Sequence, residues 1–242
     1  MTASRPAFYA LAPGGWRDYL TLLHPPYTLW HLSYVAIGAA LAPDLEVERL
    51  LAALAAFFLA LGIGAHALDE LQGHPLQTRI SDRTLVWLSV VSVGGAVAIG
   101  VYATFAYTVW LAPFVVGGAF IVFAYNLELF GGAFHSDLWF ALAWGSFPLL
   151  VGYLALAEEI TLAAVLAAAF AGFLSFAQRQ LSTQVRTVRR RVAAVSGTLE
   201  LADGGREAVT SETLTKAPEA ALRAMTLAVV SLAVGLVVLR LT

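Results

Sequence analysis

The chain has 242 residues, of which 60% are hydrophobic and 12% are charged, and its formal net charge is −2. Ordinary soluble proteins carry about 25% charged residues, so this composition leaves too little polar surface for a soluble globule and favours a membrane protein. The absence of cysteine excludes disulfides, thiolate metal sites and thiol nucleophiles. The balanced charge gives no sign of a nucleic-acid partner.

Seven apolar segments are long enough to cross a bilayer as helices, which takes about 20 residues each. They lie near 26–43, 50–70, 84–105, 107–127, 138–157, 160–179 and 219–240. The third and fourth come from one stretch without charged side chains, so we expect a tight turn near Ala106. The glycine pairs at 94–95 and 117–118 predict close contacts between helices.

The expected fold class is therefore all-α, a polytopic membrane helix bundle of about seven transmembrane helices. Continuous apolar runs do not fit the alternating strands of a membrane barrel. Residues 1–182 should hold spans one to six, and 183–217 should form a basic loop or flap. Residues 218–242 should form the last span, with Pro218 as its first helical residue.

The basic residues predict how the bundle sits in a cell membrane, because Lys and Arg gather on the cytoplasmic side. With seven spans, 12 of the 14 basic residues fall on one side, and only Arg49 and Arg240 fall on the other. We therefore expect a cytoplasmic N-terminus, cytoplasmic motif loops and a C-terminus outside.

Polar groups gather at the predicted cytoplasmic ends of four spans. They are His31 in span one, His66, Asp69 and Glu70 in span two, Tyr125 and Asn126 in span four, and Arg179 in span six. The middle of the membrane holds none of the ionisable groups that are typical of ion-coupled transporters. The pattern indicates an apolar chamber with a polar mouth on the cytoplasmic side.

Two interpretations of these polar groups stay open from the residues alone. His66, Asp69, Glu70 and His74 are spaced to share one helix face, and such imidazoles and carboxylates bind divalent metals. A helix end that is solvated among lipid headgroups tolerates the same residues. The arginine run from 179 to 191 likewise fits a positive-inside signal and attraction to anionic lipid.

Three stretches are distinctive when they are considered together. LLHPPYTLWHLSYVAIGAALAP covers the first span, AHALDELQGHPLQTRIS ends the second, and YNLELFGGAFHSDLWFALAWGSFPLLVGY runs from the fourth through the fifth. Over roughly residues 16–190 the chain resembles the UbiA superfamily of intramembrane prenyltransferases. The resemblance implies that two acidic motifs hold a prenyl diphosphate through Mg²⁺, with the prenyl tail in the apolar chamber.

The chain departs from that family's pattern at the acidic motifs. His66 replaces the first aspartate of the motif after helix two, and Gly73 replaces the last. The stretch after span six, FAQRQLSTQVRTVRRR, contains no carboxylate. Family members typically have nine helices, whereas seven spans are predicted for this chain.

The resemblance assigns roles to ten residues. Asp69 and Glu70 are implied as ligands of one Mg²⁺ and, with His66 and Tyr125, as catalytic groups. Arg179 and Arg186, with Arg79 or Arg83, are implied to replace the charge of the second metal. The implied substrate-binding residues are these four arginines together with His31 and Asn126.

The interpretation of the sequence is an integral membrane prenyltransferase-like protein. It would transfer a prenyl group from a prenyl diphosphate to a lipophilic acceptor within membrane lipid. A terpene cyclase of the same fold and a non-catalytic isoprenoid- or quinone-binding protein are the alternatives. A metal-dependent membrane enzyme that uses His31, His66, Glu70, His74 or His135 is a further class.

Overall fold

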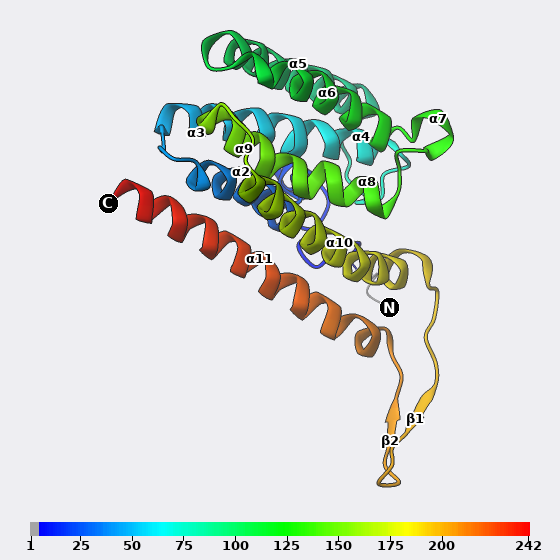
Figure 1. Cartoon of the computed structure of the whole chain (residues 1–242). Coiled ribbons are helices and arrows are strands. Elements are labelled where there is room, and N and C mark those ends of the chain that lie inside the picture. Colours follow the sequence, from blue (N-terminus) through cyan, green and yellow to red (C-terminus); the bar gives the residue numbers. More distant parts are fainter. Residues whose placement is uncertain (1–4) are drawn as a thin grey trace.

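The computed structural model describes residues 5–242 and shows long helices packed side by side, with one small β-hairpin (Figure 1). In chain order the elements are α1 (Trp16–Leu22), α2 (Pro25–Leu41), α3 (Val47–Phe57), the π-helix η1 (Phe58–Ala65), α4 (His66–Leu71), α5 (Asp82–Ala106), the 3₁₀ turn η2 (Val109–Leu111), α6 (Ala112–Asn126), α7 (Leu129–Gly132), α8 (Asp137–Ala141), the π-helix η3 (Leu142–Ser146), α9 (Phe147–Ala157), α10 (Leu162–Arg191), β1 (Thr198–Glu200), β2 (Arg206–Ala208) and α11 (Ser211–Leu241).

Six helical segments among the described residues are long and apolar enough to cross a membrane. They are Val47–Leu71, Asp82–Ala106, Val109–Asn126, Asp137–Ala157, Leu162–Arg191 and Ser211–Leu241. This finding confirms the predicted all-α membrane helix bundle. The predicted count of seven spans depends in addition on α2, which has 17 residues and is shorter than the other six segments. The seventh span therefore stays a prediction.

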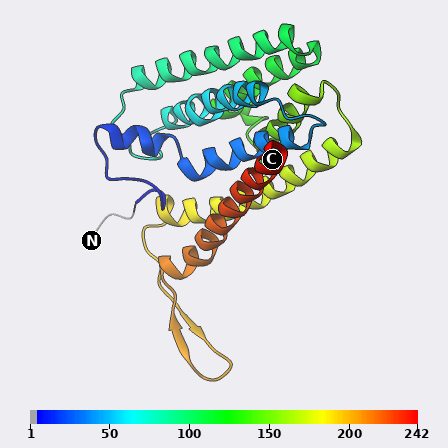
Figure 2. The same cartoon turned by 90° about the vertical axis from the view of Figure 1, so that its left-hand side faces the viewer.

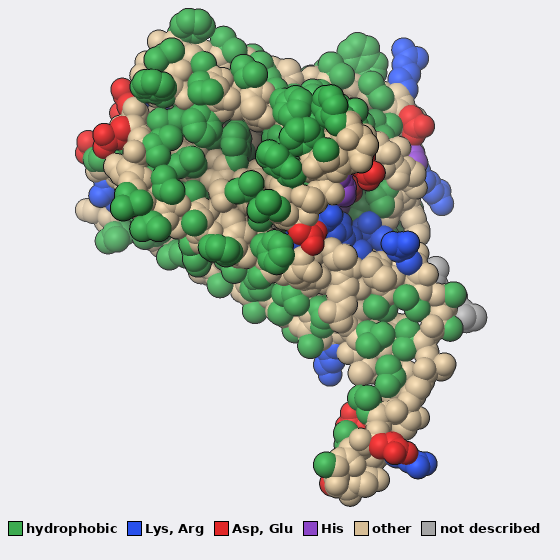
Figure 3. Space-filling view, turned by 45° about the vertical axis from the view of Figure 1, so that its right-hand side comes forward, with side chains coloured by type: hydrophobic (Ala, Val, Ile, Leu, Met, Phe, Trp, Pro, Cys, Tyr) green, Lys and Arg blue, Asp and Glu red, His purple; other side chains and the backbone are tan. Residues whose placement is uncertain are grey.

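Large apolar side chains cover the outside of the helices (Figure 3). Phe105, Phe173 and Leu162 are 88%, 78% and 74% exposed. A soluble monomer rarely exposes apolar surface on this scale, whereas lipid tails cover it without cost. The outer surface of the bundle is therefore that of an integral membrane protein.

The closest helix contact joins α2 to α9 near the centre of the bundle. A Cβ atom added at Gly38 would overlap the carbonyl oxygen of Leu149, and one added at Gly152 would overlap that of Val35. Small residues permit this backbone approach. Of the glycine pairs where close contacts were predicted, Gly95 and Gly118 are confirmed, with Leu59 and Phe147 at 3.2 Å and 3.1 Å from such a Cβ, whereas Gly94 and Gly117 have nothing within 4 Å.

Helix α5 lies beside α6 along one edge of the bundle, and α11 packs on α2 and α10 (Figures 1 and 2). The predicted turn near Ala106 is confirmed, because α5 ends at that residue and η2 leads into α6. Two segments of the bundle widen into π-helices, η1 and η3. Single π-helical turns are rare and occur frequently at functional sites.

The predicted loop 183–217 is more ordered than expected. Helix α10 continues through Arg191, and a hairpin of β1 and β2 projects from the helices (Figure 2). Helix α11 begins at Ser211, not at Pro218, because Thr210 and Thr213 form reciprocal capping hydrogen bonds.

Pro218 consequently lies inside α11, where it supplies no N–H group for the carbonyl of Leu214. The Nε2 atom of Gln184 on α10 donates to that carbonyl at 3.2 Å. A contact between two helices thus replaces the hydrogen bond that proline removes from one of them.

Candidate functional site

A cavity of approximately 420 Å³ lies at one end of the bundle. Its walls come from the N-terminal segment, α2, the η1–α4 helix, α6, the α8–η3 region and α10. Figure 3 shows Lys and Arg side chains gathered beside a histidine, where the helical body meets the projecting part that ends in the β1–β2 hairpin. Seven of the ten predicted site residues line this cavity: His31, His66, Asp69, Tyr125, Asn126, Arg179 and Arg186. Six of the polar residues that were predicted to gather at the ends of four spans, namely His31, His66, Asp69, Tyr125, Asn126 and Arg179, thus line one cavity, whereas Glu70 does not.

One face of α10 forms a basic wall of the cavity. It contributes four arginines, Arg179, Arg186, Arg190 and Arg191. Residues seven and eleven positions apart return to the same side of a helix with 3.6 residues per turn. A single helix therefore presents several guanidinium groups to one space.

These arginines differ in how they are held. The Nε atom of Arg179 lies 3.2 Å from Oδ1 of Asp137, so this cation has a carboxylate partner. Within residues 5–242, Arg186 forms no ion pair and donates only to the hydroxyl of Thr183, at 3.2 Å. Arg190 donates from Nε to the carbonyl oxygen of Pro6 at 3.2 Å. Arg186, Arg190 and Arg191 thus form no ion pair with a described carboxylate, whereas Arg179 does.

Two stacked imidazoles form a second wall. The rings of His24 and His66 stack with 4.1 Å between their centroids. Nδ1 of His24 lies 2.8 Å from the hydroxyl of Tyr9, and Nδ1 of His66 lies 3.1 Å from the carbonyl oxygen of Gly62. Burial, followed by the nearby His66 and Arg190, holds the pKa of His24 well below its usual range. A neutral His24 permits the close stacking.

Three buried polar atoms of cavity-lining residues have no hydrogen-bond partner within residues 5–242. They are Nε2 of His24, Oη of Tyr125 and Oε1 of Gln178. Tyr125 is 5% exposed and Gln178 is 3% exposed. Buried polar groups are nearly always hydrogen-bonded in folded proteins, so three such atoms around one cavity indicate that a polar ligand completes them.

Glu70 has a different environment from its neighbour Asp69. Its carboxylate is fully buried and accepts hydrogen bonds from Leu76 N at 2.9 Å, Thr78 N at 3.0 Å and Thr78 Oγ1 at 2.8 Å. His74 Nδ1 lies 3.4 Å away. Consecutive helix residues do not face each other, which is why Asp69 points to the cavity while Glu70 organises the following loop.

The predicted Mg²⁺ pair of Asp69 and Glu70 does not fit this arrangement. The Glu70 carboxylate already holds the loop, and the described residues contain no group of three His, Asp or Glu placed to bind a metal ion. Arg79 and Arg83 also lie outside the cavity lining, on an exposed part of the same loop and the start of α5. The backbone of Arg79 donates to Asp18 Oδ2 at 3.1 Å, so this residue helps to attach the loop to α1.

Other predicted site residues line the cavity and also make contacts within the protein. Nδ1 of His31 lies 2.7 Å from the carbonyl oxygen of Trp144 and links α2 to η3. The Nδ2 atom of Asn126 donates to the carbonyl of Val122 at 2.7 Å within α6. Tyr125 lies between His135 and Trp144, with ring centroids 4.5 Å and 4.4 Å away.

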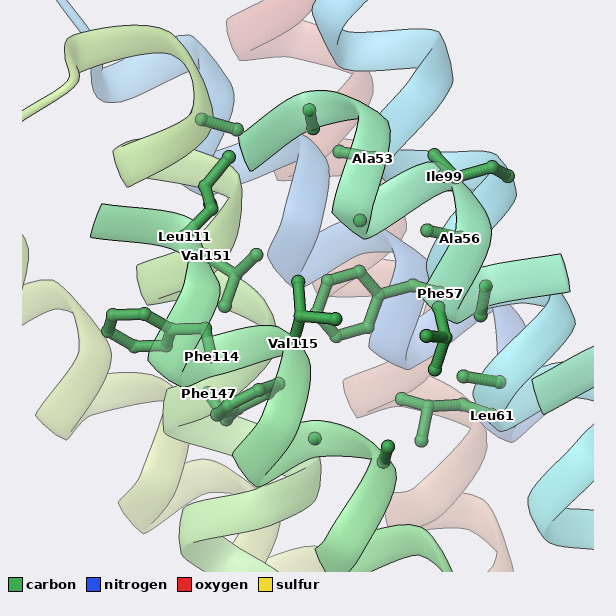
Figure 4. A pocket seen from close by; sticks show the side chains of 18 of the residues that line it. Ala53, Ala56, Phe57, Leu61, Ile99, Leu111, Phe114, Val115, Phe147 and Val151 are labelled. Carbon is green, nitrogen blue, oxygen red and sulfur yellow. The ribbon is translucent and has the colours of Figure 1, made fainter. Parts of the chain in front are cut away.

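An apolar slot of approximately 110 Å³ lies deeper in the bundle, between the α3–η1 helix, α5, α6 and the η3–α9 helix. Figure 4 shows Phe57, Leu61, Val115 and Phe147 around it. Leu61 lies about one helical turn before Ala65 and Val122 about one turn before Asn126, and the second member of each pair lines the polar cavity.

Trp144 lines both compartments. The polar cavity and the apolar slot therefore follow each other along the same helices and meet at this side chain. At the other end of the slot, the guanidinium of Arg49 lies 4.6 Å from the ring centre of Tyr107. The two compartments together suit a molecule with an anionic head and an apolar chain.

Several cavity residues were not predicted as site residues, among them Tyr9, His24 and Arg190. Arg190 lies four positions after Arg186 and shares its helix face, but this signal requires α10 to extend past the predicted end at 179. His24 lies directly before Pro25 and Pro26, in a left-handed conformation with φ 45°. No local pattern announces that the N-terminal segment folds back onto it.

Comparisons with family models, with curated proteins and with solved structures found no match for this chain. The resemblance to the UbiA superfamily consequently stays a prediction from its sequence motifs.

Proposed function

We propose that the protein is a UbiA-like integral membrane prenyltransferase, which transfers a prenyl group from a prenyl diphosphate to a lipophilic acceptor. The observation that supports this proposal is the junction of a basic polar cavity and an apolar slot at Trp144. A prenyl diphosphate has the same two parts in the same order.

The diphosphate belongs in the cavity, where Arg186 and Arg190 face it from α10. Guanidinium groups bind phosphate oxygens through paired hydrogen bonds, and these charge-assisted bonds are stronger than neutral ones. The prenyl tail extends past Trp144 into the slot, which excludes water. Transfer of its apolar surface from water into such a slot is favourable by roughly 25 cal/mol per Å².

The reaction breaks the bond between the first prenyl carbon and the diphosphate oxygen, and the bonding electrons leave with the diphosphate. The arginines stabilise the charge that develops on this leaving group. The rings of Tyr125 and Trp144 face the positive charge that develops on the prenyl chain. The acceptor then bonds to the prenyl carbon, and Asp69, a cavity carboxylate without an ion-pair partner among the described residues, takes the acceptor's proton.

We place the cavity on the cytoplasmic side of the membrane, because 12 of the 14 basic residues belong to that side in the seven-span topology. Arg49 and Arg240, the two exceptions, lie together at the opposite end of the bundle. Arg240 donates to the carbonyls of Ala42 and Pro43, close to the start of α3. Reporter fusions in the 198–208 hairpin should give a cytoplasmic signal, and a signal from outside would reverse the orientation.

The direct test incubates detergent-purified protein with farnesyl diphosphate and a lipophilic phenol and measures diphosphate release. We expect release by the wild type and a loss of about tenfold or more in Arg186→Gln, because a charge-assisted hydrogen bond contributes about 1.5–3 kcal/mol. Arg206→Gln is the matched control, since Arg206 pairs with Glu200 on the exposed hairpin. No release and no binding by the wild type would refute the proposal.

A non-catalytic prenyl-lipid-binding protein is the second candidate, and the N-terminal segment favours it. Pro6, Phe8 and Tyr9 line the cavity, and Arg190 and His24 hold this segment in place. A cavity that the chain itself partly covers suits storage of a ligand as well as turnover. Tight binding of farnesyl diphosphate without diphosphate release, for every acceptor supplied, identifies this second function.

A further inference from the structure

We infer that the arginines of α10 hold the diphosphate directly, without a divalent metal ion, and that Asp69 is free to act on the second substrate. This inference rests on the proposed function. It differs from the Mg²⁺-dependent binding that the family resemblance implies.

The carboxylates around the cavity are too few and too separate for a magnesium cluster. Asp69 on α4 and Glu128 after α6 are the two acids that line the cavity among the described residues. Glu128 lies 3.9 Å from His135, which is on the loop between α7 and α8. Glu70, the residue that would join Asp69, is occupied by three hydrogen bonds from its own loop.

The positive charge that a metal ion would supply is already part of the fold. Arg186, Arg190 and Arg191 line the cavity, and none of them forms an ion pair within residues 5–242. Arg179 adds a fourth guanidinium, which Asp137 partly neutralises. Like charges at short range repel strongly away from bulk water, so this wall attracts a diphosphate and disfavours a free divalent cation beside Asp69.

The imidazoles of the cavity do not converge on one metal site, because the described residues contain no group of three His, Asp or Glu that could hold a metal ion. Nδ1 of His24, of His66 and of His31 each lies within hydrogen-bond distance of a tyrosine hydroxyl or a backbone carbonyl. Where the hydroxyl of Tyr9 donates to Nδ1 of His24, Nε2 of that ring carries the proton. This buried and unpartnered Nε2 is then a donor for a phosphate oxygen.

The test measures the affinity of the purified full-length protein for farnesyl thiodiphosphate, which resists cleavage, once with EDTA and once with MgCl₂. We expect the two dissociation constants to agree within about twofold and Arg186→Gln to weaken binding by about tenfold in both conditions. The variant Asp69→Asn distinguishes metal-free binding from binding through Mg²⁺. Without a metal, removal of its negative charge leaves affinity unchanged or raises it, while prenyl transfer falls.

Each alternative outcome has one meaning, once thermal unfolding has shown that the variants are folded. Binding that requires MgCl₂ and weakens in Asp69→Asn overturns the metal-free site but leaves the proposed function intact. Unchanged affinity in Arg186→Gln also overturns the inference. Absence of wild-type binding in both conditions refutes the proposed function itself.

Discussion

The two ends of the bundle treat their charged groups differently. At the end away from the cavity, Arg49 lies 2.9 Å from a Glu46 oxygen and 2.7 Å from a Glu158 oxygen, and Arg240 binds two backbone carbonyls. At the cavity end, Arg186 and Asp69 face an open space without an ion-pair partner among the described residues. Desolvated charge without a partner costs free energy, so we assign the paired Arg49 and Arg240 to stability and Arg186 and Asp69 to a ligand, although the cavity end also contains the ion pair of Arg179 and Asp137.

The same contrast occurs between two consecutive residues. Glu70 is buried and its carboxylate has three donors, whereas Asp69 is half-buried and has none among the described residues. Two acids that look equivalent in the sequence therefore have different roles: Glu70 stabilises the fold, and Asp69 faces the ligand cavity.

The largest effect should follow from the change Glu70→Ala. It leaves the N–H groups of Leu76 and Thr78 and one hydroxyl without an acceptor in a buried place, and it should cost about 3 kcal/mol or more. Unfolding in detergent measures this change. Asp69→Asn is the control and should shift the free energy of unfolding by less than about 0.5 kcal/mol. Equal losses in both variants would remove the distinction between the two acids.

An intermediate effect should follow from changes at the two ends. Arg49→Ala removes a guanidinium that is only 16% exposed, so it should lower the free energy of unfolding by about 1–2 kcal/mol. It should not change the affinity for farnesyl thiodiphosphate. Arg186→Ala should do the opposite, with weaker ligand binding and unchanged or greater stability. Loss of affinity in Arg49→Ala together with intact affinity in Arg186→Ala would reverse the assignment of the two ends.

The smallest effect concerns the pH dependence of stability. It involves His74, whose ring lies 3.4 Å from the carboxylate of Glu70. A hydrogen bond from the imidazole to Asp82, 2.8 Å long, raises the pKa of His74, and Glu70 adds to the rise. A raised pKa stabilises the fold fully below the unfolded value of about 6.5, and this stabilisation is lost as pH rises through the folded value.

The difference in melting temperature between the wild type and His74→Gln should therefore shrink as the pH is raised from about 6 towards 8. The contribution of His24, whose pKa is lowered, cancels in this difference because both proteins contain it. A difference that grows with pH would show that the His74 interactions do not favour its charged form.

The membrane bundle was predictable because it depends on local apolar runs. The turn at Ala106 is confirmed, and the six residues that were predicted at one depth and line the cavity needed only helix lengths and directions. The close contact at Gly38 and Gly152 was not predicted, because glycine pairs in sequence do not reveal which side of a helix faces a neighbour. The Thr210 and Thr213 caps that start α11 before Pro218 are local, but the donor that satisfies the carbonyl of Leu214 is Gln184 of another helix, which no local pattern contains.

The candidate site was predictable only in part, because it also depends on contacts that form only after folding. Asp69 and Glu70 have similar chemistry, and their separation follows from a loop whose amide groups meet Glu70 after folding. Tyr9 reaches His24 only because the N-terminal segment folds back over the cavity. Such contacts between distant segments decide which predicted residues face a ligand.

The proposed function requires one ligand to occupy both the polar cavity and the apolar slot, with its head beside Arg186 and its tail in the slot. The most direct measurement uses a farnesyl diphosphate analogue with a photoreactive diazirine on its last isoprene unit, followed by mass spectrometry of the labelled peptides. We expect labelling of slot residues such as Phe57, Leu61 and Phe147, and loss of this labelling in excess farnesyl diphosphate. Labelling of outward-facing residues such as Phe105, with no competition, would contradict it.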